Sequence, residues 1–249
     1  MIRRKILPSL LEHLESPEIT MLVGSRQAGK TTLMELLKDE LSVRGQETVS
    51  FNLEREEDQP FFKTQMSLVE RLNLQFGDKK GYVFIDEVQR LENAGLFLKG
   101  VYDRNLQYKF VVTGSGSLEL KEKIHESLAG RKRMFEISTL TLEEFVNYKT
   151  DYQYEGKLSV FFRIDEHFSS QLMKEYLLWG GYPRVVLAQK ESDKIAILDD
   201  IYHSYLEKDI KQLLGIVKSE EFTKLLMILA DQIGRVANVS EISSTLGVD

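Results

Sequence analysis

Short apolar runs alternate with amphipathic stretches along the first 140 residues of the chain. The first run, residues 19–24 (ITMLVG), is short and apolar and ends at a glycine, which is typical of a buried strand. The stretch that follows carries Leu33, Leu37 and Leu41 at helical spacing, and a glycine then ends it. The pattern therefore predicts a strand followed directly by a helix.

The same alternation of strand and helix continues until about residue 140. Parallel strands are joined by helical crossovers, which cover both faces of the sheet. The pattern thus predicts an α/β fold with a parallel sheet. The expected strands are residues 19–24, 48–54, 81–89, 108–117 and 131–138, and the expected helices between them are 30–45, 61–76 and 96–105.

From about residue 141 onward, helical patterns broken by glycine and proline replace the strand signal. Thr141 with Glu144 three residues later is a candidate capping box at the start of a helix. Residues 238–249 resemble the first helix and turn of a helix-turn-helix that lacks its recognition helix. We therefore expect a second, all-helical part, and a chain that continues beyond Asp249 into a further domain.

The composition narrows the function classes. The chain has 249 residues, 42% of them hydrophobic, which suffices for one large domain or a domain with a smaller attachment. A net charge of −6, from 33 basic and 39 acidic residues, argues against a surface that binds phosphates throughout, although it allows a local basic patch. The chain has no cysteine, its histidines show no metal-ligand spacing, and no apolar run approaches the ~20 residues of a membrane span. Without a signal peptide either, the expectation is a cytoplasmic protein with no membrane partner.

Residues 24–31 (GSRQAGKT) match the phosphate-loop pattern G-x-x-x-x-G-K-[ST] between a predicted strand and a predicted helix. Its glycines allow consecutive amides to face phosphate groups, and the helix adds the positive end of its dipole. We expect Lys30 to reach the β- and γ-phosphates, Thr31 to bind Mg²⁺ and Thr32 to contact the α-phosphate. The alternative is a glycine turn that merely precedes a lysine. The predicted phosphate-binding residues are Gly24, Ser25, Arg26, Gln27, Ala28, Gly29, Lys30, Thr31 and Thr32.

An acidic pair follows the third predicted strand. Four apolar residues, 82–85, lead directly into Asp86 and Glu87. Asp86 is a candidate for holding Mg²⁺ through a bound water. Because side chains alternate along a strand, Glu87 points differently and is a candidate general base for an attacking water. The pair favours hydrolysis over transfer to a second substrate, and the alternative is an acidic turn that faces solvent.

A third polar element ends the fourth predicted strand. If this strand neighbours the strand of Asp86, the hydroxyls of Thr113 and Ser115 would lie beside the γ-phosphate, where one of them orients the attacking water. A plain Gly/Ser turn is the alternative.

Six segments occur in a characteristic order: GSRQAGKTTL, FIDEVQR, VTGSGSLEL, LAGRKRMFEISTLTLEEF, LLWGGYPRVV and YLEKDI. Together they resemble a prokaryotic group of AAA-superfamily P-loop ATPases, related to the archaeal-type and signal-transducing ATPases. The resemblance implies an ATPase core over residues 1–140 with five parallel strands in the order 5-1-4-3-2. A helical lid over 141–218 and the start of a winged helix over 219–249 would follow. Members of the group often carry a C-terminal domain that resembles restriction nucleases, which would make DNA a partner.

The resemblance also implies roles for the candidate residues. Residues 24–31 become the Walker A loop, and Asp86 with Glu87 becomes the Walker B pair. Ser115 or Thr113 takes the sensor-1 position.

Two arginines receive roles from the resemblance as well. Arg131 is a candidate arginine finger toward the γ-phosphate of a neighbouring subunit in a homo-oligomer, and Arg184 is a candidate second sensor that reaches back from the lid. The alternative for Arg131 is a solvated charge beside an edge strand, and for Arg184 a charge at a helix end.

Two functions are compatible with these features. The first is an Mg²⁺-dependent ATPase that couples hydrolysis to movement of the lid and of an attached C-terminal domain. The second is a nucleotide-gated switch or scaffold with little turnover that acts through assembly or DNA binding. The adjacent Asp86 and Glu87 favour the first function. A guanine-reading motif is absent from the sequence, which together with the resemblance favours ATP as the nucleotide.

Overall fold

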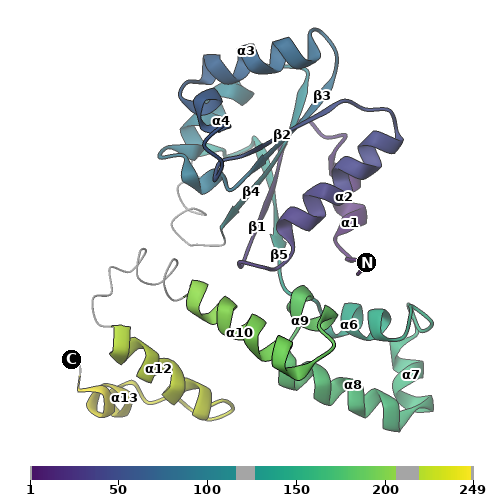
Figure 1. Ribbon diagram of the computed structural model, residues 1–249, viewed down its shortest axis with the longest axis vertical. Coiled ribbons are helices and arrows are strands. Elements are labelled where there is room, and N and C mark those ends of the chain that lie inside the picture. The colour runs from purple at the N-terminus through teal and green to yellow at the C-terminus, as the bar shows by residue number, and fades with distance from the viewer. Residues whose placement is uncertain (1, 116–126, 206–218, 248–249) are drawn as a thin grey trace. The chain divides into compact units, whose positions relative to one another are not determined.

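The computed structural model describes residues 2–115, 127–205 and 219–247, which divide into two compact units, Met1–Asp199 and Asp200–Asp249. The first unit contains a five-stranded sheet with all neighbouring strands parallel, in the order β2-β3-β4-β1-β5 (Figure 1). Read from the other edge, this is the predicted order 5-1-4-3-2, so the predicted α/β fold is confirmed. The strands are β1 (Ile19–Gly24), β2 (Thr48–Asn52), β3 (Gly81–Asp86), β4 (Tyr108–Ser115) and β5 (Lys132–Ile137).

The position of each strand in the sheet explains its hydrophobic pattern. Every residue of the inner strands β1 and β3 is buried, because helices cover both of their faces. The edge strands β2 and β5 mix buried with partly and fully exposed residues. The continuous apolar runs in the sequence therefore correspond to inner strands of a parallel sheet.

Helices cover the two faces of the sheet, with α1 and α2 on one side and α3 and α4 on the other (Figure 1). Met21 and Val23 of β1 belong to the core cluster that includes residues of α3 and α4. Leu22, which lies between them in sequence, belongs to the cluster that includes residues of α1 and α2. The alternation of side chains along a strand thus supplies both cores. The helices are α1 (Leu7–His13), α2 (Lys30–Val43), α3 (Gln65–Phe76) and α4 (Ala94–Tyr102).

The predicted helix over residues 61–76 is in fact two elements. A 3₁₀ turn, η1 (Gln59–Phe62), precedes α3, and Thr64 between them is extended. The Thr64 side chain accepts a hydrogen bond from the amide of Ser67 and so caps α3. Phe62 instead packs edge-on against Phe51 of β2, with 5.3 Å between the ring centroids. Capping and aromatic packing therefore override the helical spacing.

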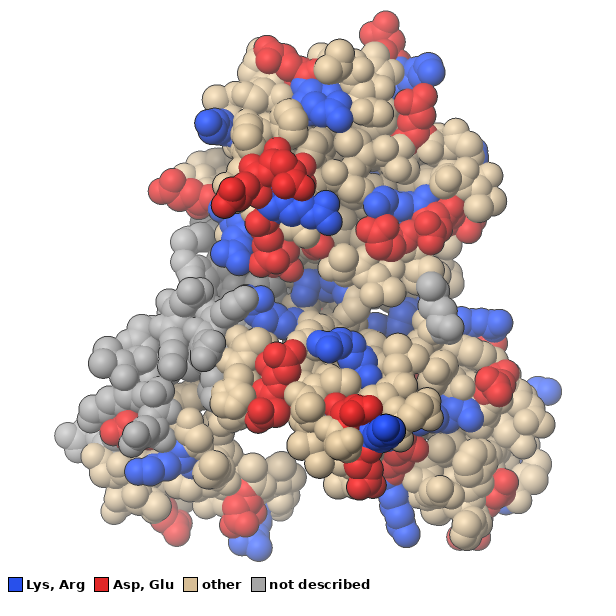
Figure 2. Space-filling model, viewed as in Figure 1, with Lys and Arg blue, Asp and Glu red and all other residues tan. Residues whose placement is uncertain are grey.

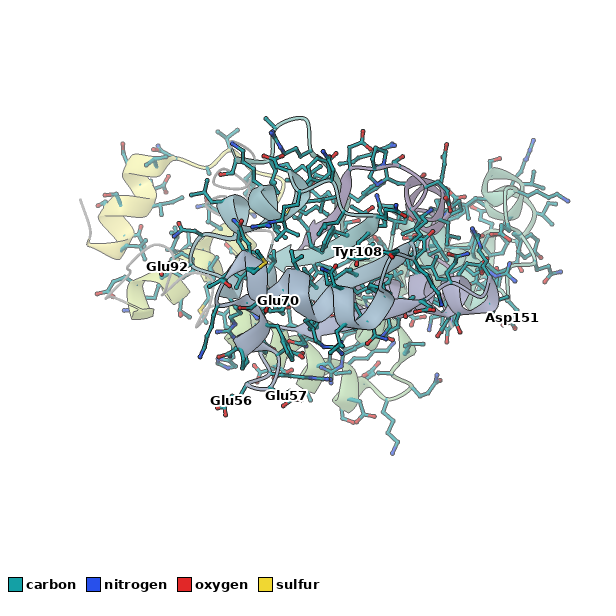
Figure 3. All side chains as sticks on the ribbon, turned by 90° about the horizontal axis from the view of Figure 1, so that it is seen from above. Glu56, Glu57, Glu70, Glu92, Tyr108 and Asp151 are labelled. Carbon is teal, nitrogen blue, oxygen red and sulfur yellow. The ribbon has the colours of Figure 1, made fainter. Side chains whose placement is uncertain are left out.

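Tyr108, the first residue of β4, joins the sheet to the end of α3. Its hydroxyl donates to the Asn73 side chain at 2.9 Å and to the Gly77 carbonyl at 3.0 Å, and burial raises its pKa. Figure 3, a view from above, shows Tyr108 over the sheet, whereas Glu56 and Glu57 project outward from the loop after β2. These two bonds tie the start of β4 to the end of α3.

After residue 141, every regular element that the structure describes is a helix. Thr141 and Glu144 form the predicted capping box at the start of α6. Among the helices of the described residues, none is both long and apolar enough to cross a membrane. The helices of this part are α6 (Leu142–Lys149), α7 (Leu158–Ile164), α8 (Glu166–Trp179), α9 (Pro183–Leu187) and α10 (Glu191–Tyr205).

The N-terminus contributes to the core of this helical part. Buried Ile2 belongs to the same cluster as Phe145 of α6, Phe161 of α7 and Leu172 of α8. The turn between α8 and α9 lies against the residues that follow β5, because a Cβ on Gly181 would lie 2.2 Å from the carbonyl oxygen of Leu140. The position therefore requires glycine, and the Leu140 amide donates to the Gly181 carbonyl at 2.7 Å.

The second unit contains the helices α12 (Ser219–Asp231) and α13 (Val239–Leu246), and the boundary between the units falls within α10. The Asn238 side chain caps α13 by accepting hydrogen bonds from the amides of Ser240 and Glu241. The winged-helix segment expected over residues 219–249 remains a prediction.

A buried histidine makes the stability of the fold dependent on pH. His13 lies at the end of α1, with Nδ1 2.8 Å from Thr20 Oγ1 and its ring edge-on to Phe135. Burial, followed by the positive charges of Lys109 and Arg133, lowers the pKa of His13 from its ordinary 6.5 to about 4. Between these values the unfolded chain binds a proton that the folded chain does not. The free energy of unfolding therefore falls as the pH is lowered through this window.

We expect the wild-type chain to lose about 2 kcal/mol more stability than His13→Gln between about pH 7.5 and pH 5, because only the wild type carries this titration. Urea unfolding of both proteins at the two pH values measures the difference. Equal losses in the two proteins would show that His13 does not titrate in this way.

Candidate functional site

The predicted chemistry-bearing residues meet at the carboxyl edge of the sheet. Gly24 at the end of β1 is in register with Ser115 of β4, and Ile85 of β3 is in register with Val112. Because all the strands are parallel, the loop after β1 and the acidic pair after β3 emerge at this one edge. Ligands in open α/β sheets bind at this edge of the strands.

The loop between β1 and α2 has a backbone suited to anions. Gly24 packs directly on the β5 backbone, since a Cβ there would lie 2.0 Å from the carbonyl oxygen of Ile137. Gly29 at the start of α2 has φ +97°, and Gln27 has φ +58°. Left-handed residues within such a turn direct successive amides to one side and form an anion-binding concavity. The two glycines of the motif are therefore needed for different reasons: Gly24 for its close approach to β5, and Gly29 for its positive φ.

Lys30 and Thr31 begin α2 directly after this loop. Lys30 is buried, and its ammonium donates to the carbonyls of Gly24 and Ser25, each at 2.9 Å. The positive charge is thereby held at the loop. The Thr31 hydroxyl donates to Asp86 Oδ2 at 3.0 Å, which connects the phosphate-loop helix to the end of β3.

Asp86, the last residue of β3, is held from two sides. One carboxylate oxygen accepts from Thr31, and the other accepts from the hydroxyl of Thr113 on β4. The Thr113 hydroxyl in turn accepts the backbone amide of Glu87 at 3.1 Å. Thr113, which is completely buried, therefore orients both residues of the acidic pair. The backbone of Ser115 lies beside Gly24, and its side chain lies outside the described residues.

Glu87 adopts a left-handed backbone, with φ 61° and ψ 45°. This conformation is uncommon for a residue other than glycine, and such residues cluster at functional sites. The bond from its amide to Thr113 holds it there, and its half-buried carboxylate accepts a hydrogen bond from the Gln89 side chain. Because β3 ends at Asp86, the direction of Glu87 follows from this left-handed turn and not, as predicted, from the alternation of side chains along a strand.

The oxygen donors of Thr31 and Asp86 fit Mg²⁺, which is a hard cation. Mg²⁺ commonly takes one or two protein ligands and completes its shell with waters and substrate phosphates. Within the described residues, no group of three or more acidic or histidine side chains is placed to hold a metal unaided. The donor set therefore fits an ion that arrives together with a nucleotide.

The structure places the two candidate arginines differently. Arg184 of α9 donates to the side chain of Gln27 in the phosphate loop at 3.0 Å. Arg131 directly precedes β5, whose first residue is in register with Ile19 at the start of β1, so it lies at the opposite edge of the sheet. There it pairs with Asp103 at 2.6 Å. One chain thus brings Arg184, but not Arg131, to its own phosphate loop.

Arg4 also contacts the loop, and the sequence did not indicate it. Its guanidinium donates to the Ala28 carbonyl at 2.9 Å and pairs with Glu144 of α6 at 3.2 Å. Its neighbour Arg3 has a side chain that is 68% exposed, whereas that of Arg4 is 8% exposed. Two adjacent arginines in a basic stretch carry no pattern that separates them. The only available signal was the capping box that contains Glu144.

A phosphate loop after the first strand of a parallel sheet, with an acidic pair after a nearby strand, defines the class of P-loop nucleotide-binding domains. The family model of the AAA domain matches residues 16–146, which is more than half of the chain, and the chain belongs to this family. A second family model, described as a domain of unknown function, matches residues 170–249.

Proteins from distant organisms are similar over almost the whole chain. An uncharacterized protein of Haemophilus influenzae is 27% identical over 249 residues, covering 98% of this chain and 59% of that protein. The uncharacterized protein Rv2008c of Mycobacterium tuberculosis is 26% identical over 247 residues, covering 99% of this chain and 48% of its own length. The chain thus spans about half the length of these relatives.

Among solved structures, PCH-2 of C. elegans is similar with a TM-score of 0.50 and 13% sequence identity. The alignment covers 82% of this chain and 69% of PCH-2. At this identity the similarity concerns the fold alone.

Proposed function

We propose that this chain is an Mg²⁺-dependent ATPase. One observation carries the proposal: a continuous set of hydrogen bonds runs from Thr31 through Asp86 and Thr113 to Glu87, beside a loop that holds Lys30. The loop residues 24–32 would bind the triphosphate through their amides and the Lys30 ammonium.

Hydrolysis requires a water placed in line with the γ-phosphate and a group that takes its proton. In our proposal the Glu87 carboxylate takes this proton as the water oxygen bonds to the γ-phosphorus. The bond from that phosphorus to the bridging oxygen breaks, and ADP and inorganic phosphate leave. Ser115 is proposed to orient the water, because its backbone lies beside Gly24 at the same edge of the sheet. Mg²⁺ held near Thr31 and Asp86 would neutralise charge on the phosphate oxygens.

We also propose that nucleotide turnover moves the helical lid, taken as residues 141–218. Two lid residues reach the phosphate loop: Arg184 contacts Gln27, and Pro183 lies where a side chain on Gly29 would approach it at 3.8 Å. A change in the loop on phosphate release would alter these contacts directly. Arg131 enters the proposal only as a residue that acts on a second copy of the chain.

A DNA partner and an attached nuclease-like domain rest on the family resemblance alone. On the face drawn in Figure 2, basic and acidic residues are interspersed over the surface of the first unit. On this face, mixed charge of this kind does not form the strongly positive patch that attracts nucleic acid. We therefore centre the proposal on the nucleotide.

Phosphate release by the purified chain tests the proposal. We expect release from ATP with Mg²⁺, little release after chelation of the metal, and a reduction of about 100-fold in Asp86→Asn, which weakens the metal site. Failure of the wild type to bind ATP would overturn the proposal. Binding of ATP with no release above background would instead support the nucleotide-gated switch and overturn the hydrolytic role of Glu87.

A further inference from the structure

The Arg4 guanidinium connects three separate parts of the chain. Nη1 donates to the Ala28 carbonyl in the phosphate loop at 2.9 Å, and Nη2 donates to the Ser138 carbonyl after β5 at 2.8 Å. Nε donates to Glu144 Oε1 of α6 at 3.2 Å. The side chains of Arg4 and Glu144 are 8% and 5% exposed. This planar fork, with its donors in fixed directions, suits acceptors that lie on different elements.

Glu144 holds Arg4 in place. Its Oε1 accepts both the Arg4 guanidinium and the backbone amide of Lys5, the latter at 2.8 Å. Its Oε2 accepts the Thr141 amide at 2.9 Å and completes the capping box of α6. Glu144 therefore cannot turn away without uncapping the helix. Ile2, two residues before Arg4, is buried in the core of the same helical part.

The contact with Ala28 fixes one peptide plane of the phosphate loop. In a trans peptide the carbonyl of one residue and the amide of the next point in opposite directions. When Arg4 holds the Ala28 carbonyl, the amide of Gly29 is directed to the other side, toward the concavity of the loop. A misdirected amide here would remove one donor from the phosphate group.

The loop also needs support from outside. Gln27 and Gly29 both have positive φ, and the conformation at Gln27 is strained because glutamine carries a Cβ. Such a backbone persists only where surrounding contacts determine it. Arg184 holds the Gln27 side chain, and Arg4 holds the carbonyl of the next residue.

We infer that Arg4 is a positioning residue for ATP: it orients the Ala28–Gly29 peptide toward the phosphates and ties the loop to α6 through Glu144. The inference rests on the proposed ATP binding. Arg4 acts through the loop backbone and does not itself touch the nucleotide. Its loss therefore weakens binding of ATP in the ground state and in the transition state alike, so KM should rise while kcat changes little.

Arg4→Lys tests the inference, with Arg3→Lys as the matched control. A lysine keeps the positive charge for Glu144 but has no planar fork with which to reach the other two acceptors. We expect the Kd for ATP and the KM to rise about tenfold in Arg4→Lys, with kcat within about twofold of wild type. Arg3, whose exposed side chain pairs with Glu155, should tolerate lysine without a change in either constant. A merely structural role would lower the active fraction, and hence the apparent kcat, at an unchanged KM.

A double variant, Arg4→Met with Glu144→Gln, removes both charges together and avoids leaving a buried carboxylate unpaired. The single oxygen of the glutamine accepts the Thr141 amide and keeps the cap of α6, whereas the Lys5 amide loses its acceptor, so the stability of the variant is measured together with its binding. We expect the same tenfold weakening of ATP binding, measured by calorimetry beside thermal unfolding. If Arg4→Lys or the folded double variant binds ATP as tightly as Arg3→Lys, the inference is overturned. Absence of binding in wild type and Arg3→Lys would instead overturn the proposed function.

Discussion

Replacing Glu87 with glutamine is expected to lower phosphate release by at least about 100-fold while ATP binding stays intact. The amide is nearly isosteric with the carboxylate but cannot take a proton from water. The backbone contact that positions residue 87, from its amide to Thr113, does not involve the altered group. A lost reaction with an intact site is therefore the specific expectation. Single-turnover phosphate release measures the chemical step, and calorimetry with Mg²⁺ and ATP measures binding.

Glu92→Gln provides the control for this substitution. Glu92 is exposed, as Figure 3 shows, and lies five residues after Glu87 on the same connection between β3 and α4. Glu92→Gln makes the same change in charge as Glu87→Gln, at a residue that does not contact Asp86 or Thr113 in the structure. Release should match that of the wild type. Equal release from wild type and Glu87→Gln would remove Glu87 from the mechanism, and a parallel fall in Glu92→Gln would reveal a general effect of charge.

The fold was predictable because its strongest signals are local. The inner strands of a parallel sheet are buried on both faces, so β1 and β3 appear in the sequence as apolar runs. Each run ends at a motif that the sequence itself shows. Gly24 is the first residue of the phosphate loop, and Asp86 is the first residue of the acidic pair. The order of the strands came from the family resemblance, since periodicity alone does not rank neighbours within a sheet.

The parts of the site that the sequence missed depend on contacts between distant residues. Arg4 reaches Ala28 and Glu144 only because the N-terminus folds against α6, and no pattern in the sequence separates it from Arg3. The role of Thr113 as the partner of Asp86 likewise requires β3 and β4 to be neighbours. The role of a side chain that contacts residues distant in sequence cannot be predicted from the spacing of residues around it.

The position of Arg131 could have been predicted more closely. It precedes the fifth strand, and in a parallel sheet the start of a strand lies opposite the edge that holds the phosphate loop. Strand direction alone therefore separates Arg131 from Lys30 within one chain. The resemblance pointed to a role toward a neighbouring subunit, and this role stays a prediction.

Lys30→Ala is expected to weaken ATP binding by about 100-fold or more, because Lys30 places a buried ammonium at the start of α2, directly beside the loop. The lysine holds the carbonyls of Gly24 and Ser25 with its Nζ, so its removal also frees two loop carbonyls. The loss therefore combines a missing charge with a looser loop. Calorimetric titration with ATP and Mg²⁺ gives the change in Kd directly.

Lys38→Ala separates this effect from a general loss of charge on α2. Lys38 lies two turns further along the helix and pairs with Glu35 at 3.0 Å. A variant that lacks Lys38 should bind ATP as the wild type does. The helix dipole and the loop amides act within the first turn of α2, and the Lys38 charge lies beyond that turn. Equal affinity of Lys30→Ala and wild type would overturn the assignment of the loop. We expect Lys30→Ala to bind ATP weakly, and Glu87→Gln to bind ATP tightly but to release phosphate slowly. Because one substitution removes binding and the other removes only the reaction, this pair of results would assign capture of the triphosphate to Lys30 and activation of water to Glu87.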